Sequence, residues 1–358
     1  MTFNDVQLLL DIFPQEICER IENPDTLVEI VLDLGRPLEL RYSSGEVEIY
    51  EDYYITEPVL DQITNKLSSF GPDNRAGIDG TLHRISRIQN RHLKTIGLTC
   101  RVGKPFYGSV DLLKDLLDNG HNILLLGSPG IGKTTKLRDA ARYLSTEGRK
   151  RVVIVDTSNE IAGDGNVTHI AVGRSRRLQV PYERNQHIVM IEAVENHTPQ
   201  VIVIDEISAI QEAQAARTIA QRGVQLIATA HGKKLEDLLN NPPLADLIGG
   251  INVVTLSDDL AKQRGLTSKT VQERKTDPTF DVVVELLSYD EIAVHTNVKE
   301  AVDALLLGGF CRAEERRILG GEMKVVMPAK ISFPVKAEPT RTKITPVERP
   351  TRGRRKHG

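Results

Sequence analysis

The glycine-rich stretch at residues 127–134 constrains the fold of this chain more than any other feature. Its sequence, GSPGIGKT, matches the pattern GxxxxGK[ST] at every defined position. The apolar run ILLL at 123–126 precedes it, and a helical pattern over about 133–144 follows it. A glycine-rich loop between a buried strand and a helix N-terminus wraps backbone N–H groups around phosphates. The sequence therefore predicts a phosphate-binding loop (P-loop), because a chance match rarely has this context.

The side chains at the end of the loop predict how a nucleotide and its metal are held. Lys133 can reach the β- and γ-phosphates, and the Thr134 hydroxyl can bind Mg²⁺. The predicted nucleotide-binding residues are Gly127, Ser128, Pro129, Gly130, Ile131, Gly132, Lys133, Thr134 and Thr135.

A second motif is the apolar run VIVI at 201–204, which ends in Asp205 and Glu206. Such a run is typical of a buried parallel strand, which delivers the acids that follow it to the sheet edge where nucleotides bind. We predict that Asp205 holds Mg²⁺ through water and that Glu206 is the general base for the attacking water. The alternative is a core strand followed by a solvated acid. The preceding P-loop favours the catalytic interpretation.

Three further polar residues follow predicted strands. His231 follows the strand at 224–229, where its ring can donate a hydrogen bond to the γ-phosphate; the alternative is an ordinary loop histidine. Asp156 ends the strand at 151–156, and Glu160 lies four residues later. These two acids can order water or Mg²⁺, or they can cap the loop that follows.

Two groups of arginines are candidates for neutralising charge in the transition state. One group lies in a long loop predicted to reach about residue 181, and the other lies in the segment 77–103. The groups are Arg174, Arg176 and Arg177, and Arg84, Arg87, Arg91 and Arg101. Arginines near a phosphate site can act within one subunit or across a subunit boundary. A charge cluster is more often a solvated surface.

Strands and helices alternate through residues 110–310, which predicts an α/β domain with a mostly parallel sheet and helices on both faces. The expected strands are 122–126, 151–156, 201–205, 224–229 and 251–256, and the expected helices are 133–144, 186–195, 209–221, 235–240 and 298–307. A hairpin is expected from 269–275 and 280–287, around Asp277 and Pro278.

The flanking segments differ from this core. Residues 1–75 predict a small α+β domain, and residues 76–109 predict an Arg- and Gly-rich connecting segment with two strands. The N-terminal domain is expected to have a helix at 3–22 that Pro14 interrupts, strands at 28–42 and 46–50, and a helix at 58–69. Periodicity is lost from about residue 322, so residues 311–358 are predicted to be a largely disordered basic tail.

Charge and cysteine usage exclude several classes of protein. The net charge of −3 argues against a polyanion binder by bulk charge, although residues 336–358 carry eight Lys or Arg and two Glu. The three cysteines include no CxxC pair, which argues against a disulfide framework or zinc site and fits a reducing compartment. No apolar run approaches the ~20 residues of a membrane span. The first residues lack a secretory signal pattern.

From about residue 77 to 287 the chain resembles the plastid and cyanobacterial AAA-type ATPases of the hypothetical chloroplast reading frame forty-five family. That family is related to stage III sporulation protein AA and, more distantly, to type II/IV secretion ATPases. The resemblance is carried by stretches such as GIDGTLHRISRIQNRH, LLLGSPGIGKTTKLRD, VVIVDTSNEIAGDG, VIVIDEIS and GVQLIATAHG.

The resemblance implies a RecA-like core with strand order 5-1-4-3-2. In that order, the strand that ends near His231 lies between the strand before the P-loop and the strand that ends in Asp205. His231 then resembles the histidine-box residue of secretion ATPases, and the Asp156–Glu160 segment resembles their acidic box. The resemblance also implies ATP as the nucleotide, a homo-oligomeric ring such as a hexamer, and a location in the plastid stroma or the cyanobacterial cytoplasm.

The leading hypothesis is therefore a Mg²⁺-dependent ATPase that acts as a motor or remodelling subunit. A second hypothesis is a nucleotide-gated binding module with little turnover. A third hypothesis is a nucleic-acid-stimulated ATPase that uses the basic tail. The sequence has no basic surface with interleaved aromatic residues, which argues against this hypothesis. Longer relatives end in a single-stranded-nucleic-acid-binding module, and this sequence has only the short basic stretch there. The protein partner is not readable from the sequence.

Overall fold

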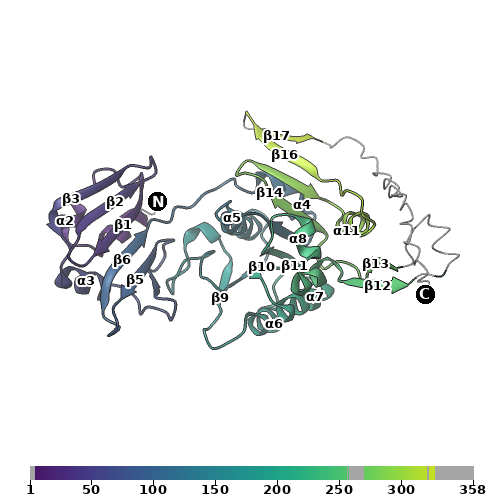
Figure 1. The fold of residues 1–358 in the computed structure, drawn as a ribbon, viewed down its shortest axis with the longest axis horizontal. Coiled ribbons are helices and arrows are strands. Elements are labelled where there is room, and N and C mark those ends of the chain that lie inside the picture. Colours follow the sequence, from purple (N-terminus) through teal and green to yellow (C-terminus); the bar gives the residue numbers. More distant parts are fainter. Residues whose placement is uncertain (1–4, 256, 258–269, 321, 327–358) are drawn as a thin grey trace, which may run out of the picture.

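The computed structural model describes residues 5–255, 257, 270–320 and 322–326. Figure 1 shows an N-terminal sheet and a larger C-terminal sheet arranged along the long axis, joined by residues 102–109. Helices within the described ranges are too short or too polar to cross a membrane. The basic stretch 336–358, on which the nucleic-acid hypothesis depends, lies outside the described residues.

The N-terminal sheet is antiparallel, with the order β3-β2-β1-β6-β5-β4. The elements of this part are α1 (Asp5–Leu10), α2 (Gln15–Cys18), β1 (Leu27–Asp33), β2 (Pro37–Tyr42), β3 (Val47–Tyr54), α3 (Glu57–Thr64), β4 (Arg75–Gly77), β5 (Arg84–Gln89) and β6 (Thr95–Arg101). Inward-facing aliphatic residues of β1, such as Ile30 and Leu32, share one buried cluster with Leu60 and Ile63 of α3. The period-two pattern therefore predicted these strands correctly.

Strands β5 and β6 come from the predicted connecting segment, and they belong to the same sheet as β1. In the register of β1 with β6, Ile30 lies opposite Cys100, and both residues are fully buried. The expected helix at 3–22 is two short helices, because Pro14 stands at the N-cap of α2.

The C-terminal part is built on a second sheet, which has the order β17-β16-β15-β14-β7-β11-β10-β8-β9 within the described residues. Its elements are η1 (Asp111–Leu113), α4 (Lys114–Asp118), β7 (Ile123–Leu126), α5 (Lys133–Thr146), β8 (Val152–Asp156), η2 (Ile170–Val172), β9 (Arg176–Gln179), α6 (Gln186–His197), β10 (Val201–Ile207), α7 (Ile210–Gln221), β11 (Gln225–Ala230), α8 (Leu235–Leu239), α9 (Pro242–Ala245), η3 (Asp246–Ile248), β12 (Ile251–Thr255), β13 (Thr270–Arg274), β14 (Val282–Leu286), β15 (Glu291–His295), α11 (Val298–Leu306), β16 (Glu314–Leu319) and β17 (Glu322–Val326). The pairs from β14 to β9 are parallel.

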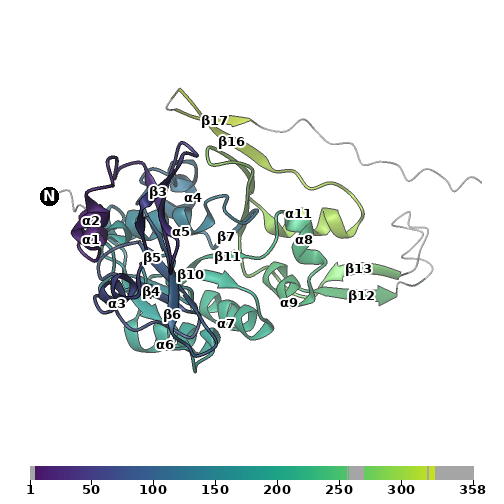
Figure 2. The ribbon, with the colours of Figure 1, turned by 60° about the vertical axis from the view of Figure 1, so that its left-hand side comes forward.

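Hydrophobic clusters lie on both faces of this sheet. One cluster packs α4 and α5 against the strands, and the other packs α6, α7, α8 and α11 against them. Figures 1 and 2 show α5 on one side of strands β10 and β11, and α6 and α7 on the other side. The predicted α/β architecture and the order 5-1-4-3-2 are confirmed, with β11 between β7 and β10.

The strand numbered 5 in that order, which lies beside the P-loop strand β7, is not the one that the sequence predicted. Residues 251–255 form β12, which pairs antiparallel with β13 in a separate two-stranded sheet. The strand beside β7 is β14, all five residues of which are buried. The predicted hairpin of 269–275 with 280–287 is therefore wrong. A buried central strand needs apolar side chains on both faces. The β12 side chains of Asn252, Val253 and Thr255 are exposed, so β12 is not such a strand.

Two stretches predicted to lack regular structure contain strands. Residues 176–179 of the expected long loop form β9, which pairs parallel with β8 at the sheet edge. Residues 314–319 and 322–326 form the β16–β17 hairpin, which extends the sheet beyond β15 (Figure 2). The prediction of a largely disordered tail over residues 311–358, with periodicity lost from 322, is thus wrong for β16 and β17.

A buried ion pair joins β14 to β15. His295 Nε2 lies 2.9 Å from Glu285 Oε1, and the same oxygen accepts a hydrogen bond from the Leu235 backbone N–H at 2.8 Å. Burial by itself lowers the pKa of His295, but the interactions with Cys311 and Glu285 outweigh burial and raise this pKa to about 9. These interactions therefore favour the charged form of the imidazole at neutral pH.

This pair predicts a pH dependence of stability. The pKa of His295 is higher in the folded than in the unfolded chain, where it is about 6.5. Its stabilising contribution is complete below about pH 6.5 and is lost as the pH rises through 9. Relative to His295→Gln, the wild-type chain should lose on the order of 3 kcal/mol of unfolding free energy between pH 6.5 and 9.5. Urea denaturation of both proteins measures this difference, and parallel pH profiles would contradict it.

Candidate functional site

The carboxyl ends of β7, β10 and β11 meet at a cavity of about 440 Å³. Parallel neighbouring strands bring the residues that follow them to one edge of the sheet. The lining residues are Pro129, Gly130, Gly132, Lys133, Thr134, Thr135, Ser158, Glu160, Asp205, Glu206, Thr229 and His231. The structure therefore brings the P-loop together with both acids of β10 and with the histidine after β11.

The loop between β7 and α5 has the shape of a phosphate cradle. Gly130 and Gly132 have φ angles of 77° and 103°, which side-chain-bearing residues rarely adopt. A Cβ at Gly130 would stand in open space, so the backbone there is accessible. Lys133 is the first residue of α5, and its Nζ donates to the Gly127 carbonyl at 2.7 Å. Its ammonium group thereby lies over the loop. Three of the predicted nucleotide-binding residues, Gly127, Ser128 and Ile131, belong to the loop without lining the cavity.

Asp205 lies near the end of β10 with only 7% of its surface exposed. The hydroxyl of Thr229 in β11 donates to the Asp205 carbonyl at 2.6 Å and joins the two strand ends. Burial raises the pKa of Asp205 to about 7, with further increases from the charges of Asp156 and Glu160 and an opposing effect from Ser158. A cation beside this carboxyl would stabilise its charged form.

Glu206 and His231 line the same cavity from neighbouring strands. The Glu206 carbonyl accepts a hydrogen bond from Gln186 Nε2 at 2.7 Å, which fixes the backbone beneath an exposed side chain. His231 directly follows β11 and is exposed. The next residue, Gly232, accepts a hydrogen bond from the Gly127 backbone N–H at 2.8 Å. The segment that carries His231 is therefore tied to the P-loop.

Asp156, the last residue of β8, and Glu160, which follows the strand, have different environments. Asp156 is fully buried, and its carboxylate accepts hydrogen bonds from the backbone N–H groups of Ala162 at 2.9 Å and Ile161 at 3.4 Å. Burial raises its pKa, and these hydrogen bonds oppose the increase. Asp156 therefore caps the following loop and does not line the cavity, whereas Glu160 does.

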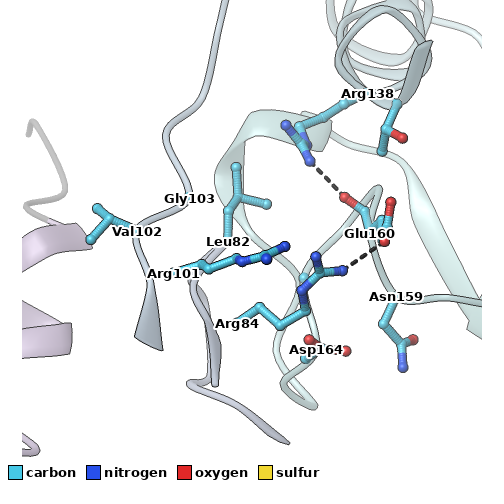
Figure 3. A pocket seen from close by; sticks show the side chains of 11 residues that line it. Leu82, Arg84, Arg101, Val102, Gly103, Arg138, Asn159, Glu160 and Asp164 are labelled. Atoms are coloured by element: carbon cyan, nitrogen blue, oxygen red, sulfur yellow. Dashed lines mark hydrogen bonds and ion pairs between the residues drawn. The ribbon is translucent and has the colours of Figure 1, made fainter. Parts of the chain in front are cut away.

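Glu160 also contacts the N-terminal sheet. Its carboxylate accepts a hydrogen bond from Arg84 Nη1 of β5 at 2.7 Å, and Arg75 lies 4.0 Å away. Arg138 of α5 donates to the carbonyl oxygens of Glu160 at 2.6 Å and Ile161 at 2.7 Å. Figure 3 shows Arg84 and Arg138 reaching Glu160 from the two parts of the protein. The loop that lines the cavity is thus held from both sides.

A smaller cavity of about 230 Å³ lies at this junction (Figure 3) and shares Thr134 and Glu160 with the first. Its lining residues are Leu82, Arg84, Arg101, Val102, Gly103, Thr134, Arg138, Asn159, Glu160, Gly163 and Asp164. Burial raises the pKa of Asp164 to about 6. The N-terminal sheet therefore contributes side chains next to the P-loop threonine.

The arginines predicted between β8 and α6 lie elsewhere. Arg177 donates to the carbonyl oxygens of Gly165 at 2.6 Å and Asn166 at 3.2 Å, so its guanidinium organises a loop. Arg176 Nη1 lies 3.4 Å from His197 Nδ1, and Arg174 is exposed. None of these three arginines lines either of the two cavities.

Sequence reasoning missed Ser158, Thr229 and Arg138 as site residues. Ser158 and Thr229 are short polar residues beside the ends of β8 and β11, which is a signal that could have identified them. Arg138 is 9% exposed on α5, and its partners are backbone carbonyl groups of a distant loop. Nothing in the local pattern of that helix indicates such a contact.

The donor set of the larger cavity fits a magnesium nucleotide. In the part of the chain that the structure describes, no cluster of three or more His, Cys, Asp and Glu forms a metal cage. Mg²⁺ rarely needs one, because one or two protein oxygens, waters and substrate phosphates hold it. The Thr134 hydroxyl and the Asp205 carboxylate supply such oxygens beside Lys133.

The strand order and this cavity define a RecA-like P-loop fold. The crystal structure of the pilus retraction motor PilT with bound ADP is similar in fold, with a TM-score of 0.50 and 16% sequence identity. The alignment covers 74% of this chain and 82% of that one.

The chain belongs to the family described as sporulation stage III, protein AA, which its sequence matches over residues 75–259. It is 52% identical over 318 residues to the uncharacterised protein ycf45 of Porphyra purpurea, covering 88% of this chain and 56% of that protein. It is 49% identical over 337 residues to the protein SEEDLING PLASTID DEVELOPMENT 1 of Arabidopsis thaliana, covering 93% of this chain and 48% of that protein. The chain thus spans about half the length of these two relatives. The family resemblance expected from the sequence is confirmed.

Proposed function

We propose that this chain binds and hydrolyses ATP with Mg²⁺. The observation that carries the proposal is the single cavity in which Lys133 and Thr134 of α5 face Asp205, Glu206 and His231. This set combines a cation for phosphates, oxygen donors for a metal, a carboxylate base and a hydrogen-bond donor.

Each side chain has a defined part in the proposed reaction. The P-loop N–H groups and Lys133 bind the β- and γ-phosphates. Glu206 orients the attacking water and accepts its proton, and His231 donates a hydrogen bond to the γ-phosphate. Thr134 and Asp205 would hold Mg²⁺, which neutralises charge on the phosphate oxygens when bound.

Phosphate release by the purified full chain tests this proposal. Release should be saturable in ATP and should stop when a chelator removes Mg²⁺. Tight ATP binding without phosphate release above background would favour the nucleotide-gated module instead.

We propose that the active form is a ring-shaped homo-oligomer, such as a hexamer, that acts as a motor or remodelling subunit. The family and the RecA-like fold support the proposal. Native mass measured with and without ATP tests it, and a monomer under both conditions contradicts it. We also propose a location in the plastid stroma or the cyanobacterial cytoplasm. The name SEEDLING PLASTID DEVELOPMENT 1 supports the plastid, and fractionation of the native protein tests the location.

We further propose that the ion pair of Arg84 with Glu160 couples the N-terminal sheet to the nucleotide cavity. The pair is partly exposed, so Arg84→Ala should cost less than about 1 kcal/mol of unfolding free energy. It should nevertheless loosen the junction, so that chymotrypsin cleaves after the exposed residues Phe106 and Tyr107 of the connecting segment severalfold faster. Arg91→Ala, at an exposed position in the β5–β6 turn, is the control. Equal cleavage rates in all three proteins would rule out the proposed coupling.

A further inference from the structure

Two exposed aromatic rings stand beside the end of the P-loop. Phe106 of the connecting segment is 56% exposed, and Tyr289 of the β14–β15 loop is 37% exposed. Their ring centroids are 5.6 Å apart, with an angle of 63° between the planes. A Cβ on Gly132 would lie 3.8 Å from Tyr289 Cδ2, so the tyrosine ring is at van der Waals distance from the last glycine of the loop.

A buried lysine of α5 holds both ring-bearing segments in place. Lys136 is only 1% exposed, and its Nζ donates to the Ser109 carbonyl at 2.8 Å and to the Tyr289 carbonyl at 3.1 Å. The same Nζ lies 5.2 Å from the centroid of the Tyr289 ring. Burial lowers the pKa of Lys136. A buried ammonium group is costly unless it is hydrogen-bonded, so these contacts keep the two segments next to α5.

A buried acid one turn later fixes the connecting segment again. Asp139 is 1% exposed and accepts hydrogen bonds from the Ser109 hydroxyl and the Val110 backbone N–H, both at 3.2 Å. The segment that carries Phe106 is therefore attached to the helix that begins with Lys133 and Thr134.

The position of the rings relative to the cavity indicates what they can bind. Residues 129, 130 and 132–135 line the cavity in which a triphosphate would lie, and the sugar and base of a nucleotide must extend away from it. The Tyr289 ring lies against Gly132 at the end of the same loop, the Phe106 ring packs edge-on with it, and both rings are partly exposed. Planar heterocycles stack on such faces without requiring specific hydrogen bonds.

We propose that Phe106 and Tyr289 form the subsite for the nucleobase. The proposal rests on the proposed nucleotide binding and extends it, because it makes the ligand a nucleoside triphosphate rather than a bare polyphosphate. The subsite combines one ring from the segment between the two sheets with one from the β14–β15 loop. The affinity for the base would therefore depend on the packing of the connecting segment against α5.

Calorimetric titration of the full chain with Mg²⁺–ATP and with Mg²⁺–tripolyphosphate tests the subsite. Phe106→Ala and Tyr289→Ala should each weaken ATP binding about tenfold to a hundredfold, which corresponds to about 1.4–2.8 kcal/mol. Tripolyphosphate binding should stay unchanged, which also shows that the P-loop remains folded. Phe310→Ala is the matched control, because Phe310 is 58% exposed and lines a different cavity.

The measured ratio of the two dissociation constants separates the possible outcomes. If both variants keep the wild-type ratio, the rings do not bind the base and the subsite proposal is wrong, while nucleotide binding stands. The ratio is kept either when neither affinity changes or when both weaken equally, and in the second case the rings only support the loop. If the wild-type chain binds neither ligand, nucleotide binding itself is wrong and the subsite is wrong with it.

Discussion

Replacing Lys133 by alanine is expected to lower ATP binding and turnover by at least about a hundredfold. Lys133 begins α5, its ammonium group lies over the P-loop 2.7 Å from the Gly127 carbonyl, and it lines the cavity. The next lysine of α5, Lys136, is buried, and its ammonium group is hydrogen-bonded to the Ser109 and Tyr289 carbonyls. Lys136 therefore does not replace the charge that neutralises the phosphates.

Equilibrium binding of labelled ATP and phosphate release measure the effect of Lys133→Ala. Lys299→Ala on α11 is the control, because the Lys299 side chain is 59% exposed and pairs with an exposed acid. Circular dichroism should show the same secondary structure in both variants. Phosphate release that persists at the wild-type rate in Lys133→Ala would mean that the activity belongs elsewhere or to a contaminant.

Replacing Glu206 by glutamine is expected to abolish hydrolysis while leaving ATP binding within about threefold of wild type. General base catalysis contributes roughly 10²–10⁴ to a rate, and glutamine keeps the shape of the side chain without its proton affinity. Glu206 lines the cavity opposite the P-loop, and its backbone is held by Gln186. The substitution therefore changes the chemistry with little change to the site geometry.

Single-turnover phosphate release and ATP binding, measured together, test this prediction. Glu236→Gln, at an exposed position of α8, is the control. Hydrolysis by Glu206→Gln at more than about a tenth of the wild-type rate would show that another group accepts the proton. Loss of binding together with hydrolysis would instead give Glu206 a role in holding the nucleotide.

The nucleotide cavity could be predicted from the sequence because each of its parts is local. The P-loop is one continuous segment between an apolar strand and a helix, and Asp205 and Glu206 follow directly in a strand with four apolar residues. Once these strands lie parallel in one sheet, with β11 between them, the motifs lie at the same edge.

The neighbours of the cavity could not be predicted in the same way. The contact of Arg84 with Glu160 joins residues that are 76 positions apart, and Lys136 contacts a carbonyl 153 positions away. The arginines of residues 174–177 carried the more conspicuous sequence signal, yet they bond to loop carbonyls or lie at the surface. Residue type and clustering do not show which distant backbone a long side chain will reach.

The sequence by itself determined the phosphate-binding loop, the acid-bearing strand and the alternation that produces a parallel sheet. These features depend on local periodicity and on the order of motifs along the chain. Tertiary structure alone decided that β14, and not residues 251–255, lies beside β7, and that the N-terminal sheet contacts the acidic loop. The physical reason is that strand choice and domain contacts depend on how completely both faces of an element are buried, and distant residues determine that burial.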